Sequence, residues 1–307
     1  MTDLFYYLWF HKVKEDEPLW GPAAAEYFKI IYGDTRVVAA VDPNVKITVG
    51  YGDEGFITGD SPLVYTIHFE NQPDATAPAQ RVVVTDQLSD HLDWTTVELL
   101  SIGFNKVDLI LPEGLTHFET MSAVDTDPNP VHVRAEFNRD TGLLTWLIES
   151  LDPETGDLPG DPLAGFLPPN KDCGGCGEGY VSFVVWPKRG LVSGTAIKNK
   201  ATIVFDVNAP IDTAEVMNTI DDIAPTSSVL ALPPVTNTDA FRVSWAGSDN
   251  SGGSGVAFFD IYVSIDGGPF KLWLSETEKT SEVFSGAYGH TYEFYSVATD
   301  HVWNVQE

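Results

Sequence analysis

The sequence has little positive charge. Only 17 lysines and arginines stand against 45 aspartates and glutamates in 307 residues, which gives a formal net charge of −28. A nucleic-acid-binding surface needs Lys and Arg side chains to neutralise phosphates, so this balance excludes nucleic acid as a partner. The excess of carboxylates suits a well-solvated surface, and it also suits the binding of divalent cations.

Long hydrophobic runs are missing as well. The run LFYYLWF at residues 4–10 is far shorter than the ~20 residues that a membrane-spanning helix needs. No basic residues precede it and no small-residue cleavage site follows it, so it is not typical of a signal peptide. We therefore expect no membrane span, and an extracellular location implies that the chain is an excerpt of a longer secreted protein.

Cysteine is nearly absent. The two cysteines, Cys173 and Cys176, stand in DCGGCGEG. One CxxC pair is half of a zinc ribbon and gives structural zinc little support. No strand–helix–strand pattern surrounds the pair, which disfavours a thioredoxin-like site. The favoured interpretation is a loop pair that closes a small disulfide.

Catalytic motifs are also lacking. The seven histidines are scattered, and neither HExxH nor GxSxG occurs. The many carboxylates leave room for a glycosidase pair, but abundance alone does not indicate one. We therefore expect a protein that is not an enzyme, with a hydrolase using an acidic metal site as a remaining alternative.

What the sequence does contain is alternation of apolar and polar residues with a period of two. In FRVSWAG, Phe241, Val243 and Trp245 alternate with polar residues, and FFDIYVSI repeats this over residues 258–265. Asp-, Asn-, Gly- and Pro-rich turns such as NRDTG and IDGGPF separate these runs. The predicted fold class is all-β, organised as tandem β-sandwiches.

Composition shifts predict two β-domains. The segment VMNTIDDIAPTSSVLALPP carries acidic residues, Pro and Ser between two strand-rich blocks, and a softer boundary lies near VVAAVDPNVK. The predicted organisation is a leader or the end of a preceding module at residues 1–40, a larger sandwich at 41–221 and a smaller one at 222–307.

Three segments of the terminal block share a family pattern: APTSSV, FRVSWAGSDNSGGSGVAFFDIYVSIDGGPFKLWL and GHTYEFYSVATDHVWN. They resemble a fibronectin type III or bacterial immunoglobulin-like module. Trp245 matches the core tryptophan of the second strand, and Tyr292 stands where such modules place a tyrosine corner. Ser296 departs from the pattern at a usually apolar inward position, and the chain stops at Glu307, where a seventh strand should begin.

The larger block contains YTIHFENQPDATAPAQRVVVTDQLSDHLDWTT and GTAIKNKATIVFDVNAPIDT. These phrases resemble a conserved-repeat β-sandwich of very large secreted or surface bacterial proteins. The resemblance implies an architecture and a location, not a reaction. The expected partners are neighbouring modules of the same parent chain and a cell-surface glycan or protein.

The glycine-rich segment GSDNSGGSGV, residues 247–256, joins two predicted strands. A phosphate-binding P-loop needs a Lys after its glycines and a helix after the Lys, and both are missing here. Phosphate binding is therefore excluded for this loop.

Calcium is the better functional interpretation. Ca²⁺ prefers six to eight oxygen ligands, and in an immunoglobulin-like sandwich the B–C and F–G loops lie at one pole. Side chains from both loops and from the entering linker are expected to share one ion: Asp249, Asp300 and Asn304 from the loops, with Asp221 or Asp222 from the linker. The ion would stiffen the junction with the preceding domain. In the alternative, Asp249 makes an Asx turn and Asp300 caps a hairpin.

Lys46 on an early strand and Asn199 on a late one suggest a covalent crosslink. Related surface sandwiches form Lys–Asn isopeptide bonds, which need both side chains adjacent, buried and beside a carboxylic acid that moves protons. The sequence alone does not pair this Lys with this Asn. The alternative is an exposed Lys and an Asn that bonds to the backbone.

The leading expectation is a non-catalytic structural or adhesive segment of a large extracellular bacterial protein, with calcium stiffening its acidic loops. The alternative is a carbohydrate-binding module accessory to a secreted enzyme. Tyr262, Trp273 and Trp303 would then stack on sugars, although strand aromatics also pack in cores.

Overall fold

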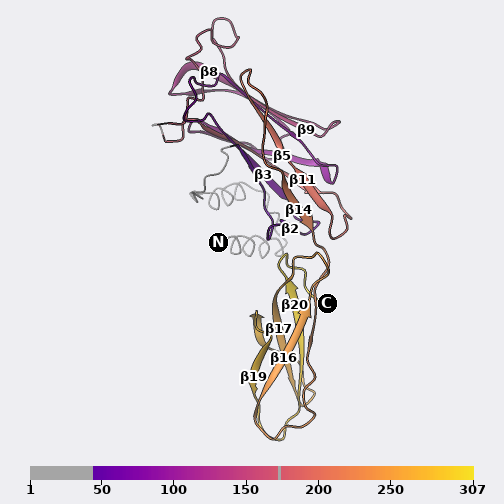
Figure 1. The fold of residues 1–307 in the computed structure, drawn as a ribbon. Coiled ribbons are helices and arrows are strands. Elements are labelled where there is room, and N and C mark those ends of the chain that lie inside the picture. The colour runs from indigo at the N-terminus through magenta and orange to yellow at the C-terminus, as the bar shows by residue number, and fades with distance from the viewer. Residues whose placement is uncertain (1–43, 172–173) are drawn as a thin grey trace. The chain divides into compact units, whose positions relative to one another are not determined.

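The computed structural model describes residues 44–171 and 174–307, so the predicted leader and Cys173 lie outside it (Figure 1). Every regular element assigned in the described residues is a β-strand, from β1 to β20, which confirms the all-β prediction. No helix within this part of the chain could cross a membrane.

The chain divides into two compact units. The described part of unit 1 comprises residues 44–49, 60–171, 174–189 and 197–217, and unit 2 comprises residues 50–59, 190–196 and 218–307. The predicted domains were contiguous. Unit 2, however, takes in two short segments that the sequence analysis placed in the larger domain. Local patterns do not reveal such segments, because they join unit 2 through backbone pairing with residues distant in sequence.

Unit 1 is a sandwich of two antiparallel sheets. The five-stranded sheet has the order β1 (Val45–Ile47), β3 (Leu63–Glu70), β10 (Glu178–Pro187), β5 (Leu92–Phe104) and β6 (Val107–Ile110). The six-stranded sheet has the order β13 (Ile211–Asp212), β12 (Ala201–Phe205), β4 (Arg81–Gln87), β9 (Leu143–Ser150), β8 (Asp127–Asn138) and β7 (His117–Val124).

Aromatic contacts join the two sheets of unit 1. Trp146 of β9 packs on Phe183 of β10, with ring centroids 5.8 Å apart, and Phe69 of β3 packs edge-on against Phe205 of β12. These rings come from opposite sheets, so the core lies between them. Burial of such rings is a large part of what stabilises a sandwich.

Unit 2 contains two three-stranded sheets. One has the order β15 (Thr226–Val229), β16 (Ala240–Ser248) and β19 (Ser281–Ser285), and the other β18 (Lys271–Thr277), β17 (Val256–Ile265) and β20 (Tyr292–Asp300). Trp245 lies in the core, as expected, and is 1% exposed. The Tyr292 hydroxyl accepts a hydrogen bond from the Ala287 N–H at 2.7 Å, which ties the start of β20 to the preceding loop.

Ser296, the inward polar exception, has partners. The Ser227 hydroxyl lies 2.9 Å from the Ser296 hydroxyl and 2.6 Å from Gln306 Oε1. Because these bonds satisfy the buried hydroxyl, a serine is tolerated where an apolar residue is usual.

The remaining strands lie where the chain passes between units: β2 (Phe56–Ile57), β11 (Ala196–Asn199) and β14 (Val216–Ile220). Within unit 2, β2 runs parallel to the end of β14, with Thr219 opposite Phe56 and Ile220 opposite Ile57. This pairing attaches residues 50–59 to unit 2 and fixes the backbone just before Asp221.

Candidate functional sites

Lys46, Asp86 and Asn199 lie together in the interior of unit 1. They are 2%, 1% and 3% exposed and come from β1, β4 and β11. The Lys46 ammonium contacts Asp86 Oδ2 as a buried ion pair. Hydrogen bonding from the Asn199 side chain opposes the rise in the pKa of Asp86, although neither polar atom of Asn199 makes a hydrogen bond of normal geometry. The alternative of an exposed Lys and a backbone-bonded Asn is therefore wrong.

The alternation of the strands explains why these polar groups are inside. In β4, Val82, Val84 and Asp86 occupy successive buried positions, while the residues between them are partly exposed. Lys46 is likewise the buried residue of β1, and Asn199 is a buried position of β11. Each polar residue stands where the period-two pattern calls for an apolar one.

Aromatic rings surround the Lys46 amine. Its Nζ lies 4.3 Å from the centroid of the Tyr65 ring and 5.3 Å from that of Phe183. Tyr65 is fully buried, and its hydroxyl has no hydrogen-bond partner. The surroundings are therefore of low polarity, which strengthens electrostatic interactions and penalises charge.

Burial drives both charged partners toward their neutral forms. It lowers the pKa of Lys46 to about 8, although the neighbouring Asp86 opposes the shift. Burial also raises the pKa of Asp86, against the opposing influence of Lys46 and Asn199. Both shifts favour the neutral amine and the neutral carboxylic acid over the ion pair, and the Asn199 amide lies beside them.

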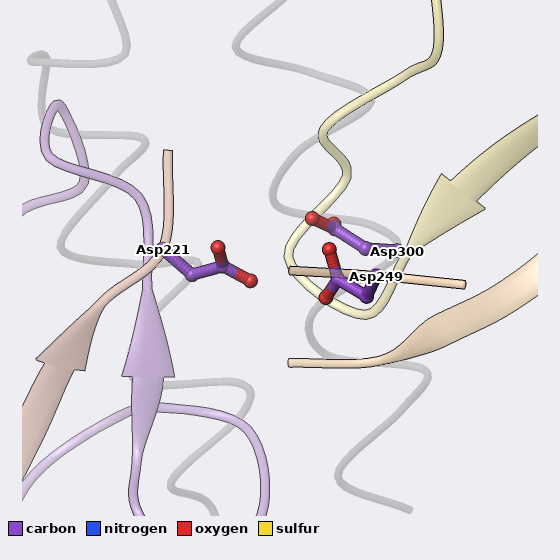
Figure 2. A group of neighbouring side chains, drawn as sticks. All are labelled: Asp221, Asp249 and Asp300. Carbon is purple, nitrogen blue, oxygen red and sulfur yellow. The ribbon is translucent and has the colours of Figure 1, made fainter. Parts of the chain in front are cut away.

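A second cluster lies within unit 2, where Asp221, Asp249 and Asp300 converge (Figure 2). One carboxylate oxygen from each lies within 4.8 Å of the others. Asp221 follows β14, Asp249 lies between β16 and β17, and Asp300 ends β20. In Figure 2 the Asp221 carboxylate points toward the other two. The loops that the sequence placed at one pole therefore meet.

The glycine-rich loop is shaped around Asp249. Its Oδ1 accepts from the Asn250 N–H at 2.8 Å, and its Oδ2 accepts from the Gly255 N–H at 2.7 Å. Gly255 has φ of +85°, a conformation that favours glycine. A Cβ at Gly253 would lie 2.6 Å from Asp249 Oδ2 and from Asn250 Oδ1, so a side chain there would displace the acidic group.

Asn304 brackets the cluster through its amide nitrogen. Nδ2 donates to the backbone oxygen of Asp221 at 2.7 Å and to Asp300 Oδ2 at 2.8 Å. The Asn304 N–H donates to Asp300 Oδ1 as well. The structure thus places Asn304 as a donor that holds two of the acids, whereas the sequence predicted an oxygen ligand.

Asp222 is engaged elsewhere. Its Oδ1 accepts from the Gly59 N–H at 2.7 Å, and its own N–H donates to the Ser193 hydroxyl at 2.7 Å. It is not part of the group formed by Asp221, Asp249 and Asp300. It fastens residues 50–59 and 190–196 to the rest of unit 2.

Burial raises the pKa of Asp300 to about 7, and the neighbouring Asp221 adds to the rise, while hydrogen bonds from Asn304 and Val302 oppose it. Among the ion pairs of the described residues, none involves any of the three carboxylates. The cluster therefore holds its charge only at a cost, unless a proton or a cation joins it.

Sequence analysis did not include Asn250 among the ligands. One end of its carboxamide faces three oxygens: Asp249 Oδ1 at 2.8 Å, and Ile223 O and Asp221 Oδ1 both at 3.3 Å. With the nitrogen at that end, the side chain donates to the cluster. That orientation satisfies both ends of the carboxamide, and a cation bound at this point would need the oxygen there instead.

Cys176 is buried and disulfide-bonded. The only other cysteine of the sequence, Cys173, lies outside the described residues, so its pairing with Cys176 stays a prediction.

Each of the three proposed sugar-stacking aromatics packs against another aromatic ring. Trp273 packs edge-on against Trp245 and Phe284, so it belongs to the core of unit 2. The Tyr262 ring stacks on Tyr295 at 4.7 Å with an interplanar angle of 7°, so each covers a face of the other. Trp303 packs against Phe258.

One family model and several solved structures are similar to this chain. A family model described as a domain of unknown function (DUF7619) matches residues 42–111 and 166–219. No curated protein sequence matches the chain. Among solved structures, domains D2 and D3 of the major pilin SpaD from Corynebacterium diphtheriae match with 14% identity over 86% of this chain and 78% of that chain, at a TM-score of 0.34.

Two further solved structures are similar at this level. The fibronectin(III)-like modules of CbhA from Clostridium thermocellum share 11% identity over 86% of this chain and 90% of theirs, with a TM-score of 0.30. The collagen-binding domain of a Staphylococcus aureus adhesin shares 6% identity over 60% of this chain and 100% of its own, with a TM-score of 0.31.

Proposed function

We propose that this chain is a non-catalytic structural segment of a longer extracellular or cell-surface protein, in which Ca²⁺ stiffens the acidic loops of unit 2. The observation that carries the proposal is the convergence of Asp221, Asp249 and Asp300 from three segments distant in sequence. The parent chain's neighbouring modules are the expected partners, and the segment would present an adhesive surface to a cell-surface glycan or protein.

Electrostatics supports a cation at this cluster. Asp221 and Asp300 are buried and Asp249 is partly buried, so three negative charges would repel one another with little water to screen them. A divalent cation removes that repulsion and gains oxygen ligands. Backbone N–H donors already orient each carboxylate, so little reorganisation is needed.

The oxygens suit calcium more than a transition metal. Carboxylates, an amide and a backbone carbonyl are hard ligands, and no His or Cys belongs to the group. Protein atoms would supply the three carboxylates and Ile223 O, Asn250 would add Oδ1 if its carboxamide turned from the donor orientation, and water would complete the shell. Extracellular calcium modules bind with dissociation constants of about 10⁻⁴–10⁻³ M, a range that extracellular calcium fills.

A bound ion would have a mechanical consequence. It would tie the end of β14, the loop between β16 and β17, and the end of β20 to one point. Loops that otherwise move independently would then open only with loss of the ion.

Calcium titration by calorimetry at neutral pH tests this proposal. Wild-type protein is expected to bind one Ca²⁺ with a dissociation constant in the millimolar range or below, and Asp249→Asn to weaken binding at least tenfold. Asp239→Asn is the matched control, because Asp239 is an exposed acid of unit 2 outside the cluster. Absence of binding by wild type at millimolar Ca²⁺, or an equal loss in both variants, would overturn the proposal.

The role of Asn250 can be tested separately. Asn250→Asp keeps an oxygen at the position that faces the acids and is expected to retain binding, whereas Asn250→Ala is expected to weaken it. If both variants bind Ca²⁺ like wild type, the side chain is a hydrogen-bond donor and not a ligand.

A further inference from the structure

We propose that unit 1 carries an intramolecular amide bond between Lys46 Nζ and Asn199 Cγ, which the protein forms itself with Asp86 as the proton carrier. The inference concerns unit 1 alone and does not depend on calcium binding by unit 2.

Asn199 is a polar residue in the interior of unit 1. It is almost fully buried, neither Nδ2 nor Oδ1 makes a hydrogen bond of normal geometry, and the polar group that its side chain influences is the Asp86 carboxyl. Buried amides normally have partners, because an unmet donor or acceptor inside a protein is unfavourable. An Asn that is only structural would be expected to bond. An Asn that reacts with a neighbouring amine needs its Cγ close to that amine, and it does not need hydrogen bonds of its own.

The register of β12 with β4 places Asn199 beside Asp86. Ala201 of β12 pairs with Asp86 of β4, and Asn199 lies two residues before Ala201. Residues two apart on extended chain point to the same face, so Asn199 and Asp86 are diagonal neighbours on the inner surface. Their side chains meet inside the sandwich without distortion of either strand.

Lys46 reaches this point from the other sheet. β1 pairs with β3, with Lys46 opposite Ile67, so Lys46 belongs to the five-stranded sheet, whereas Asp86 belongs to the six-stranded sheet. The Lys46–Asp86 contact therefore spans the interior of the sandwich. A bond from Lys46 to Asn199 would join the first described strand of one sheet to the chain that enters the other.

Protonation favours the reaction. Burial lowers the pKa of Lys46 to about 8 and raises the pKa of Asp86, so burial favours the neutral amine and the acid form of the carboxyl. A neutral amine is the nucleophile, and a neutral carboxylic acid can donate a hydrogen bond to the amide oxygen. The rings of Tyr65 and Phe183 limit the access of water that would compete with the amine.

The chemical step balances without any co-reactant. Lys46 Nζ attacks Asn199 Cγ while the Asp86 acid hydrogen-bonds to Oδ1, which stabilises the developing oxyanion. Asp86 then transfers a proton from the attacking nitrogen to Nδ2. The C–Nδ2 bond breaks, ammonia leaves, and a secondary amide remains with Asp86 restored to its acid form. A primary amine and a primary amide are thus converted to one secondary amide and one ammonia.

Intact mass under denaturing conditions tests the bond in the natural chain. After reduction of the disulfide, wild-type protein is expected to weigh one ammonia less than its sequence. Tryptic digestion is expected to give a branched peptide that joins the segments around Lys46 and Asn199, with no cleavage after Lys46. The full sequence mass in protein that is folded by circular dichroism would overturn the proposal, and so would an ammonia loss that maps to another asparagine.

Variants assign the roles. Asn199→Ala and Asp86→Ala are each expected to abolish the ammonia loss. Lys198→Ala is the matched control, because Lys198 neighbours Asn199 in β11 but is exposed and paired with Glu215; it is expected to keep the loss. Retention of the loss in folded Asp86→Ala protein would contradict Asp86 as the proton carrier. The branched peptide in wild type needs no variant, so misfolding of a variant leaves the bond itself testable.

Discussion

The two units treat buried charge in opposite ways. In unit 1 an amine and a carboxylate face each other inside the core, with an amide beside them. In unit 2 three carboxylates meet with no cationic side chain paired to them among the described residues. The first group contains opposite charges that neutralise each other, and its amine and amide can react without a group from the medium. The second group needs a proton or a cation from the medium. We therefore expect unit 1 to be insensitive to calcium and unit 2 to respond to it.

The largest expected effect comes from removing the crosslink. Asn199→Ala leaves the Lys46–Asp86 pair intact but prevents the bond that would close the chain between residues 46 and 199. Closing so long a loop stabilises a folded chain by about 4–5 kcal/mol in the chain-entropy model. The melting transition of unit 1 is expected to fall by roughly 10–15 °C, at about 2–4 °C per kcal/mol for a domain of this size.

Differential scanning calorimetry measures this change. Lys198→Ala should change the stability of unit 1 by no more than about 0.5 kcal/mol, which is typical of surface substitutions, and its transition temperature should therefore change little. Equal small shifts in both variants would mean that no covalent bond holds unit 1.

The next effect is the pH dependence of calcium-free unit 2. The pKa of Asp300 is raised in the folded state from 3.8 to about 7, so the folded protein holds a proton that the unfolded chain releases. This contribution to stability is complete below pH ~4 and is lost as the pH rises to ~7. The full shift corresponds to about 4 kcal/mol, and screening by solvent at this partly accessible carboxyl reduces the expected effect to roughly 2 kcal/mol.

The measurement is chemical denaturation in EDTA across this pH window, compared with Asp300→Asn, which cannot titrate at that position. The stability difference between wild type and variant should move against wild type as the pH rises. A difference that stays constant, or that moves in favour of wild type, would contradict the raised pKa.

The smallest expected effect is a gain in stability of unit 2 when one acid of the cluster is neutralised. Asp221→Asn keeps an oxygen that can accept from the Ser254 N–H and removes one of three like charges. In calcium-free protein at neutral pH this substitution is expected to stabilise unit 2 by about 0.5–1 kcal/mol, because it removes the repulsion between Asp221 and the other two carboxylates. Denaturation in EDTA checks this, and destabilisation would contradict the claim that the acids repel one another.

Sequence reasoning reached the acidic cluster because topology alone brings its loops together. Once residues 222–307 resembled an immunoglobulin-like module, Asp249 and Asp300 had to lie at one pole. Asn250 was missed because an Asn in a glycine-rich loop is fully explained by a turn. Its approach to Asp221 depends on loop conformation, which no periodic pattern encodes.

The site in unit 1 was reached only in part. Lys46 and Asn199 were paired as a hypothesis, but Asp86 was overlooked although RVVVTDQL places it in the same row as Val82 and Val84. An acid in an inward row is a signal that sequence carries. Its meeting with Asn199 is not, because it follows from the register of β4 with β12, strands far apart in the chain.

The discontinuous boundary between the units could not be predicted from the sequence either. Residues 50–59 join unit 2 through two parallel pairs between β2 and β14 and through the Gly59–Asp222 hydrogen bond. Such short, non-local backbone pairings leave no periodicity in the residues that form them.

The claim that a covalent bond holds unit 1 while an ion holds unit 2 is tested most directly by calorimetry of the natural chain. Scans at neutral pH in millimolar Ca²⁺ and in EDTA are expected to show two transitions, of which only that of unit 2 moves. At calcium concentrations about tenfold above the dissociation constant the gain is roughly 1.4 kcal/mol. Two transitions that both move, or neither of which moves, would contradict the account.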